Sequence, residues 1–333
     1  MKLKYAFVLL IVTFSLFSSI LTINAHGATQ ADDTLASIKS KGYITIGADT
    51  TYAPFESIDP NSSMPVGFDV DLSVAVAHDM GAALGVKLDV HYQTSAWDPI
   101  IPNLQQKKFD IILSAMTITA DRAKEVDFSR WYYQSYQAWM VPKDNPKGLT
   151  KLSDLNQTGL KVGVQRGTTE DLFMNQSLPN ADQHRYDDVP TAIQALKQGS
   201  LDVVLGDYAV LALAVHDDPS FIVPGLYSPE YFGIAVRLGD TNLLNAINSA
   251  LNNLLGSNTT NPQPSDLYNS LYDKWFYNNS PGYTGTVTNA ALPTDVVLKY
   301  SQGGSTPGFE FLSIFVVALI PIVRKLKVRK VNK

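Results

Sequence analysis

Residues 113–128 bring together side chains that could bind a charged small molecule. Ser114, Thr117 and Thr119 carry hydroxyl groups, and Arg122 stands three positions after Thr119. An arginine presents a planar fork of five N–H donors, which matches the two oxygens of a carboxylate. The segment therefore indicates a site for an anionic group, although an isolated motif of this kind is more often a surface arginine that pairs with a neighbouring acid.

The elements predicted around Arg122 would place it at the edge of a sheet. Residues 109–113 are apolar and β-branched after a Lys-Lys break, which predicts a short buried strand. Thr119 is a suitable cap for a helix that would begin there, with acid in its first turn. Where a strand feeds a helix in an open α/β sheet, the backbone N–H groups of the junction lie in the crevice that binds ligands.

The composition argues against several other kinds of site. The chain has 333 residues, no cysteine and a net charge of −5, so it offers neither thiol chemistry nor the basic surface typical of nucleic-acid binding. Its five histidines are scattered, without the spacing of a metal site. We therefore expect no cofactor, no metal and no nucleic-acid partner.

Both ends of the chain differ from its body. Residues 1–28 contain two lysines, a nearly uncharged run and then small residues, which predicts a secretory signal, with an uncleaved anchor as the alternative. Residues 307–333 consist of Pro-Gly-Phe, a short apolar run and a basic tail. This pattern resembles the archaeal PGF-type sorting signal, which implies a processed, lipid-anchored C-terminus; a plain tail anchor is the alternative. Residues 277–306 are predicted to be a stalk, with the body on the extracellular face of the membrane.

The body alternates predicted strands and helices, which indicates an α/β fold with largely parallel sheets. Residues 167–170 are expected to cap one further helix. Strands are expected at residues 43–48, 87–90, 109–113, 132–141, 161–164, 201–205, 221–223 and 232–236, and helices at residues 67–84, 97–107, 190–198, 207–216, 243–255 and 266–276.

Two extended segments, near residues 132–136 and 228–232, would carry the chain between two lobes. One lobe is expected to consist of residues 34–132 with 232–276, and the other of residues 136–228. A cleft between two such lobes is a usual place for a small ligand, and hinge closure would bury it.

Several short motifs occur in an order that resembles a known family. They are Gly-Ala-Asp49-Thr-Thr-Tyr52-Ala-Pro-Phe55-Glu56, Gly67-Phe68-Asp69-x-Asp71, Leu113-Ser-x-x-Thr117-Ile-Thr-x-x-Arg122, Val162-Gly-Val-Gln165-x-Gly167-Thr-Thr169, Leu205-x-Asp207 and Lys274-Trp275-Phe276. Together they resemble the extracytoplasmic polar-amino-acid-binding proteins of ABC importers (solute-binding protein family 3), over roughly residues 34–276. The resemblance implies a two-lobed periplasmic-binding-protein fold of type II, with a two-segment hinge, and a protein that is not an enzyme.

The resemblance also implies how the two charges of an amino acid would be bound. Arg122 would bind the α-carboxylate, helped by Thr117 and by the backbone of Thr169, and Asp207 would receive the α-ammonium. The physics agrees, because a zwitterion that leaves water needs both charges paired.

For the side chain of the ligand, the resemblance implies a sandwich between Tyr52 and Trp97. Asp49 would reach its far end, and Gln165 would line the pocket from the second lobe. Two aromatic faces accept an aliphatic stem and attract a cation at its end. The full set of predicted ligand-binding residues is Asp49, Tyr52, Trp97, Ala115, Thr117, Arg122, Gln165, Thr169 and Asp207.

Single residues keep structural alternatives. Asp207 could simply cap the helix that follows it, and Tyr52 and Trp97 could be ordinary core aromatics. Glu56 could support the site from behind or lie at the surface, with similar weight. Arg166 is expected to point outward. Two acids of the motifs are expected to be structural: Asp69 and Asp71.

The predicted function is capture of a polar or basic L-amino acid for an ABC permease, by a monomer held at the membrane. Asp49 favours arginine, lysine, histidine or glutamine over the acidic amino acids. One rival is a lyase that resembles cyclohexadienyl dehydratase, for which Glu56 or Asp49 would have to assist the chemistry. The other is a sensory ectodomain, although only ten residues follow Val323, which leaves no room for a signalling domain.

Overall fold

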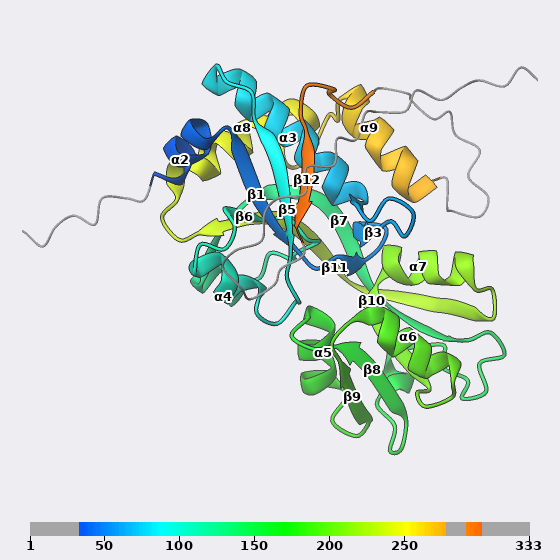
Figure 1. The fold of residues 1–333 in the computed structure, drawn as a ribbon. Coiled ribbons are helices and arrows are strands. Elements are labelled where there is room, and N and C mark those ends of the chain that lie inside the picture. The colour runs from blue at the N-terminus through cyan, green and yellow to red at the C-terminus, as the bar shows by residue number, and fades with distance from the viewer. Residues whose placement is uncertain (1–32, 278–290, 302–333) are drawn as a thin grey trace, which may run out of the picture. The chain divides into compact units, whose positions relative to one another are not determined.

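The computed structural model describes residues 33–277 and 291–301, and a sheet of nine strands organises this part of the protein (Figure 1). In spatial order the strands are β12 (Leu298–Ser301), β5 (Asp89–Thr94), β1 (Tyr43–Ala48), β6 (Ile111–Ile112), β11 (Phe221–Arg237), β7 (Val126–Pro142), β10 (Val203–Asp207), β8 (Lys161–Gln165) and β9 (Asp182–Tyr186). A second, antiparallel sheet contains three short strands: β2 (Thr51–Tyr52), β3 (Glu56–Ile58) and β4 (Pro65–Val66).

The two longest strands, β7 and β11, pair with each other and join two α/β lobes (Figure 1). Their antiparallel register runs from Val126 opposite Arg237 to Pro142 opposite Phe221, with several shifts on the way. We call the half with β5, β1 and β6 the first lobe, and the half with β10, β8 and β9 the second lobe. Neighbouring strands within these two sets run parallel, so the two-lobed α/β architecture predicted from the sequence is confirmed.

Helices pack against the sheet in both lobes. The first lobe carries α2 (Thr34–Lys41), α3 (Phe68–Leu84), α4 (Ile100–Gln105), α8 (Thr241–Leu255) and α9 (Asp266–Tyr272), and the second carries α5 (Thr169–Ser177), α6 (Val189–Lys197) and α7 (Tyr208–Asp217). A π-helical turn, η3 (Asp273–Tyr277), continues α9.

Local sequence explains where several helices begin and end. Thr168, Asp188 and Ser265 cap α5, α6 and α9, because each side chain accepts a hydrogen bond from the backbone N–H three residues later. The cap of α5 was predicted and is confirmed. At the C-terminal end of α3, Gly85 takes the left-handed conformation, with a φ of 68°, which glycine adopts at low cost.

An aromatic cluster in the first lobe holds the segment that carries Asp49 and Tyr52. The ring of Phe55 lies 5.0 Å from that of Tyr133 and 5.3 Å from that of Phe232, both in edge-to-face geometry. Phe55 is fully buried. Because Tyr133 and Phe232 belong to β7 and β11, the loop after β1 is packed directly against the strands that connect the lobes.

The structure corrects the elements predicted next to Arg122. In place of a helix that starts at Thr119, there is a single 3₁₀ turn, η1 (Arg122–Lys124). The N-cap of this turn is Asp121 and not Thr119 as predicted, although the Thr119 hydroxyl oxygen accepts a hydrogen bond from the Arg122 N–H at 3.1 Å. β6 keeps two of the five predicted residues, although the backbone N–H groups of Asp110 and Leu113 also donate to β1.

Other elements differ in extent. The two strands predicted at 221–223 and 232–236 form one strand, β11, which passes Pro224 and Pro229 by register shifts. The helix predicted at 97–107 is the shorter α4, and the strand predicted at 87–90 is β5, displaced toward the C-terminus. β9 was not predicted, because its sequence, DQHRY, lacks apolar alternation.

The predictions for the two ends fall mostly outside the described residues. This applies to the secretory signal at 1–28, to the sorting signal or anchor at 307–333 and to much of the stalk. Within the segment expected to be a stalk, β12 pairs in parallel with β5, so residues 298–301 belong to the sheet (Figure 1). In the described part of the chain, no helix has the length and apolar character needed to span a membrane.

Candidate functional site

One pocket is lined by every residue predicted to bind the ligand. Its free internal space is small, about 20 Å³. The predicted residues in its wall are Asp49, Tyr52, Trp97, Ala115, Thr117, Arg122, Gln165, Thr169 and Asp207. Four further lining residues are Glu56, Ser114, Thr168 and Glu170.

Side chains from the two lobes meet around this pocket. The Tyr52 hydroxyl donates to Asp207 Oδ2 at 2.7 Å, and Gln165 Nε2 donates to Asp49 Oδ2 at 2.8 Å. The indole N–H of Trp97 donates to the Gly167 carbonyl oxygen at 3.1 Å. All three bonds connect an element of the first lobe with one of the second, so the pocket is closed in this structure.

Arg122 is the only lysine or arginine among the described residues that line the pocket. Its guanidinium donates to the Thr117 carbonyl oxygen at 3.0 Å and to the Gly167 carbonyl oxygen at 3.3 Å. The guanidinium carbon also lies 5.1 Å from the centre of the Trp97 ring, a cation–π contact. Burial lowers the pKa of Arg122, while nearby carboxylates oppose that shift. These contacts hold the fork in place beside the first turn of α5.

Asp207 ends β10 and stands at the N-cap of α7, as the structural alternative predicted, but its side chain makes no capping hydrogen bond. It accepts instead from Tyr52 and from the Ser135 hydroxyl, at 2.7 and 2.8 Å. Burial, followed by the charge of Glu230, raises the pKa of Asp207 to about 7. The carboxyl is therefore turned into the pocket and not toward its own helix.

Asp49 is held at another side of the pocket by short polar contacts. The Thr51 hydroxyl donates to Asp49 Oδ1 at 2.7 Å, and Gln165 donates to the other oxygen. Burial raises the pKa of Asp49, and these two hydrogen bonds oppose the shift. Gln165 also donates to the Asp187 carbonyl oxygen, so it links Asp49 to the second lobe.

Buried acids of the first lobe support the loop that carries Ser114 and Ala115. Glu56 is fully buried and accepts from the Ser114 hydroxyl at 2.6 Å, while Ser114 Oγ accepts from the Asp49 N–H. Asp69 accepts from the Ala115 N–H at 2.7 Å, where the backbone is left-handed with a φ of 43°. Of the two roles considered for Glu56, this geometry favours support of the site over a surface position.

Asp69 and Asp71 do not line the pocket, in agreement with the structural role expected for both. Asp69 also accepts from the Tyr132 hydroxyl, and Asp71 accepts from Lys274 and from the indole N–H of Trp275. Arg166 points outward, as predicted, with its side chain 50% exposed near Asp98 and Asp187.

Two acids near the pocket were not predicted from the sequence. Glu170 lies in the first turn of α5, where it looks like an ordinary N-terminal acid, and Glu230 lies in β11, outside every motif. Among the described residues, Glu170, Asp207 and Glu230 form a group of three acids close enough to surround one cation. Their sequence separations carry no recognisable metal spacing, so pattern alone could not have joined them.

The pocket wall can bind both an anionic and a cationic group, because it contains groups of both charges. One guanidinium and the N-terminus of α5 face several carboxylates across a small closed space. Such a wall suits a molecule that carries both an anionic and a cationic group.

Comparison with known proteins gives the same architecture. The protein is 33% identical to the "Probable histidine-binding protein" of Neisseria gonorrhoeae over 272 residues, which cover 80% of this chain and 94% of the relative. It is 33% identical to "ABC transporter arginine-binding protein 1" of Escherichia coli (strain K12) over 239 residues, or 70% and 90% of the two chains. A crystal structure of a mutant of ArgBP from T. maritima superposes with a TM-score of 0.63 at 37% identity, covering 73% of this chain and 99% of that one.

These three proteins are named for binding and not for catalysis, which agrees with the prediction that the chain is not an enzyme. The structural match confirms the predicted periplasmic-binding-protein fold of type II. Residues 44–278 match the model of one family, and this match covers more than half of the chain. The protein therefore belongs to the bacterial extracellular solute-binding proteins, family 3.

Proposed function

We propose that the protein captures a polar or basic L-amino acid (arginine, lysine, histidine or glutamine) and delivers it to an ABC importer. The single observation that carries this proposal is the meeting of all nine predicted residues around one closed pocket. The names of the relatives, which refer to histidine and arginine, support the same class of ligand.

The proposed contacts pair the α-carboxylate and the α-ammonium of the amino acid with groups of opposite charge. Arg122 would bind the α-carboxylate together with Thr117 and the N-terminal backbone of α5 at Thr169, where helix N–H groups favour an anion. Asp207 would receive the α-ammonium. Because Arg122 and Asp207 come from different lobes, one zwitterion bound by both would stabilise the closed form.

The rest of the wall would select the side chain. Tyr52 and Trp97 would lie on either side of it, and Asp49 with Gln165 would meet its polar end, aided by Ala115 in the loop. A carboxylate at that position favours a cationic or amide group over an acidic one. This arrangement would favour arginine, lysine, histidine or glutamine as the ligand.

The cellular setting is part of the proposal. We infer that residues 1–28 direct secretion, that residues 307–333 hold the protein at the extracellular face of the membrane as a sorting signal of archaeal type or an anchor, and that a permease is its partner. Residues 34–132 with 232–276 and residues 136–228 would move as two lobes of a monomer.

Calorimetric titration with the twenty amino acids tests the proposal. The protein is first unfolded and refolded to remove any bound ligand, and folding is checked by circular dichroism. We expect heat from at least one of the four named amino acids, and loss of most of it in Arg122→Ala and Asp207→Asn but not in Arg166→Ala. Absence of binding to any amino acid, on folded protein, would refute the function.

A further inference from the structure

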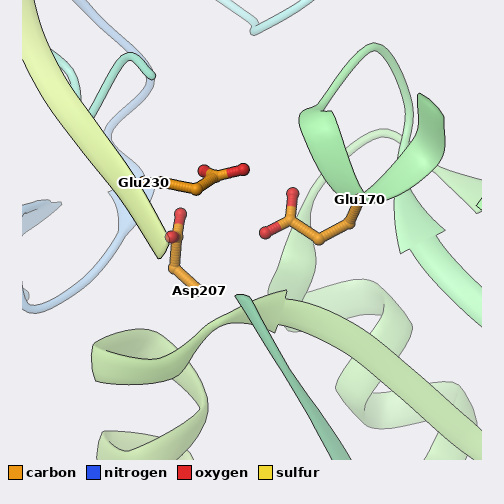
Figure 2. A group of neighbouring side chains, drawn as sticks. All are labelled: Glu170, Asp207 and Glu230. Carbon is orange, nitrogen blue, oxygen red and sulfur yellow. The ribbon is translucent and has the colours of Figure 1, made fainter. Parts of the chain in front are cut away.

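Three buried carboxylates converge beside the pocket, and we call them the carboxylate cluster: Glu170, Asp207 and Glu230. One oxygen from each lies within 4.8 Å of the others. They come from α5, from the end of β10 and from β11, and Figure 2 shows them directed toward a common space. Their exposed fractions are 2%, 4% and 6%, so water contributes little to their solvation.

Neutral donors satisfy both oxygens of two members of the carboxylate cluster but only one oxygen of the third, Glu170, whose Oε2 accepts from the Thr169 hydroxyl at 3.4 Å. Both oxygens of Asp207 and both oxygens of Glu230 accept hydrogen bonds, and the donors are the side chains of Tyr52, Ser135, Thr117 and Gln137. Glu170 Oε1 has no hydrogen-bond partner among the described residues. Its carboxyl group is aimed at the other two (Figure 2). A buried polar atom without a partner is costly, which points to a missing donor at this position.

The groups that face the carboxylate cluster do not balance its charge. Arg122 is the cation on its pocket side, and the tyrosines around it are Tyr52, Tyr133 and Tyr227. Burial raises the pKa of each of these tyrosines well above its ordinary value, so they stay neutral near pH 7. Three carboxylates therefore face one guanidinium.

Without a ligand, protons must relieve this excess of negative charge. Burial raises the pKa of Asp207 to about 7, and burial with the charges of Asp207 and Glu230 raises the pKa of Glu170 well above its ordinary range. Two carboxylates this close can avoid repulsion by keeping a proton between them.

We propose that an ammonium group of the captured amino acid enters the carboxylate cluster, directs N–H donors at its three carboxylates and displaces a proton from Glu170 to solvent. This rests on the proposed function and adds Glu170 as a ligand-contacting residue. An ammonium is compact and has three donors, which matches three acceptors better than the flat guanidinium does. No covalent bond changes except that an O–H proton passes to water and N–H···O contacts take its place.

The exchange makes capture depend on pH in a defined direction. Because binding releases a proton, raising the pH favours the bound state, and lowering it returns the proton to the carboxylate cluster. The amino acid would then be held most tightly above pH 7, where the ammonium competes with few protons.

Calorimetry in two buffers of different ionisation enthalpy counts the released protons. With L-arginine as the probe at pH 6.5, the wild-type protein should release about one proton per ligand. Glu170→Gln keeps the shape of the side chain but cannot ionise, so it should release clearly fewer protons than the wild type, and those that remain would come from Asp207. The affinity of the variant should depend less steeply on pH between about 5.5 and 7.5 than that of the wild type, which should rise by up to about tenfold per pH unit.

Glu125→Gln is the matched control, because it is the same chemical change at an exposed position. It should behave as the wild type in both measurements. Glu170→Asp retains the acid, so it should keep the proton release even if the affinity falls. Since the proton count is first made on the wild type, a folding defect in one variant does not remove the test.

Three outcomes would overturn the inference. If wild-type protein binds arginine with no proton release in either buffer, the exchange is refuted while the proposed function stands. If Glu170→Gln releases as many protons as the wild type, Glu170 is not the source. If calcium or manganese alone binds tightly and Glu170→Gln abolishes that binding, the carboxylate cluster is a metal site. Failure of all amino acids to bind would instead count against the proposed function.

Discussion

At the level of single residues, the environment of Arg122 depends on the shape of its side chain. The guanidinium donates to two carbonyl oxygens in different directions and lies over the Trp97 ring. A flat, delocalised cation can do all three, while the lysine ammonium is a strongly hydrated point charge. Charge alone is therefore not sufficient at this position.

We expect Arg122→Lys to weaken binding of the preferred amino acid by about 2 kcal/mol, on the order of 30-fold, because the charge remains but the fork is lost. Calorimetry on the folded variant measures this. Arg166→Lys is the matched control, since Arg166 is half-exposed and its nearest acids lie at 3.6 and 3.9 Å. Equal affinities of Arg122→Lys and the wild type would contradict the proposed role of Arg122.

Eight of the nine predicted pocket residues could be named from the sequence because they lie within motifs of fixed order, and Trp97 was named through the family resemblance alone. Glu170 and Glu230 could not, and the reason is physical. Glu170 occupies a helix position that commonly carries an acid, and Glu230 projects from a strand whose neighbours are defined only by pairing with β7. Their proximity arises from tertiary structure, which no local pattern encodes.

At the level of elements, the turn before α3 depends on a glycine. Gly67 has a φ of 143°, and a Cβ atom there would lie 2.0 Å from the Phe55 carbonyl oxygen. That oxygen is backbone, and it accepts the Asp69 N–H at 2.9 Å, so it cannot move away easily. The close approach of the two chains at Gly67 therefore sets where α3 begins relative to the pocket loop.

Gly67→Ala should lower the free energy of unfolding by about 3 kcal/mol or more, or prevent folding, since both the conformation and the space exclude a methyl group. Gly85→Ala is the control, because its φ is also positive but no atom lies within 4 Å of the added carbon. It should lose only about 1 kcal/mol. Denaturant unfolding curves compare the two, and similar losses would show that the contact with Phe55 is unimportant.

Strand β12 covers the edge of the first lobe. It pairs with β5 from Leu298 opposite Val90 to Ser301 opposite Gln93, and the Tyr300 hydroxyl lies 3.0 Å from Thr94 Oγ1. Leu298 and Tyr300 also pack against the main core. An uncovered β5 would expose unpaired backbone groups, which are a hazard for aggregation.

A chain that ends at residue 290 should therefore be less stable than one that ends at residue 301, by about 2 kcal/mol, since it loses this pairing and apolar contact. Affinity for the amino acid should be the same in both, because β12 contributes no residue to the pocket wall. Thermal unfolding and calorimetry measure the two quantities. Loss of binding in the shorter chain would mean that β12 shapes the site.

Elements whose sequence has a clear apolar period could be predicted, whereas strands whose extent depends on pairing with a neighbouring strand could not. The helices α6 and α8 have an apolar face and were predicted within two residues of their bounds. β9 is polar, and β11 contains two prolines, so neither shows an unbroken strand pattern. Their extent follows from pairing with β8 and β7.

At the level of the whole molecule, buried acids make stability depend on pH. Burial raises the pKa of Asp69 and of Asp207 from 3.8 to about 7. Between these values the unfolded chain has released the two protons while the folded chain retains them. These two acids therefore make stability fall as the pH rises through this window, and only part of the effect is offset by His91, whose pKa burial lowers to about 4.

We expect the ligand-free protein to lose on the order of 2–4 kcal/mol of unfolding free energy between pH 4 and 7. Asp69→Asn should reduce the slope, because it removes one of the titrating groups. Denaturant unfolding at several pH values, with ligand removed, gives the curve. A stability that rises steadily from pH 5 to 7 would contradict the raised pKa values of both acids.

The two-lobed architecture could be predicted because strand–helix alternation, repeated on both sides of two extended segments, permits few arrangements. The closed pocket could not, since it depends on contacts such as Tyr52 with Asp207 and Trp97 with Gly167, which join residues far apart in the chain. The pairing of β12 with β5 could not be predicted for the same reason, because β12 is short and its partner lies about two hundred residues earlier in the chain.

The continuous pairing of β7 with β11 limits how the molecule can open. Two strands joined by many hydrogen bonds cannot slide past each other without breaking many of these bonds at once. The lobes must therefore open by bending of the β7–β11 pair. Bending is easiest where the ladder is irregular, near Pro229 and Gly233. Substitutions at those irregular steps should change the angle between the two lobes in the ligand-free protein, and hence the rate of ligand uptake, while every ligand contact stays the same. Small-angle scattering of Pro229→Ala without ligand would measure this change in the angle between the lobes.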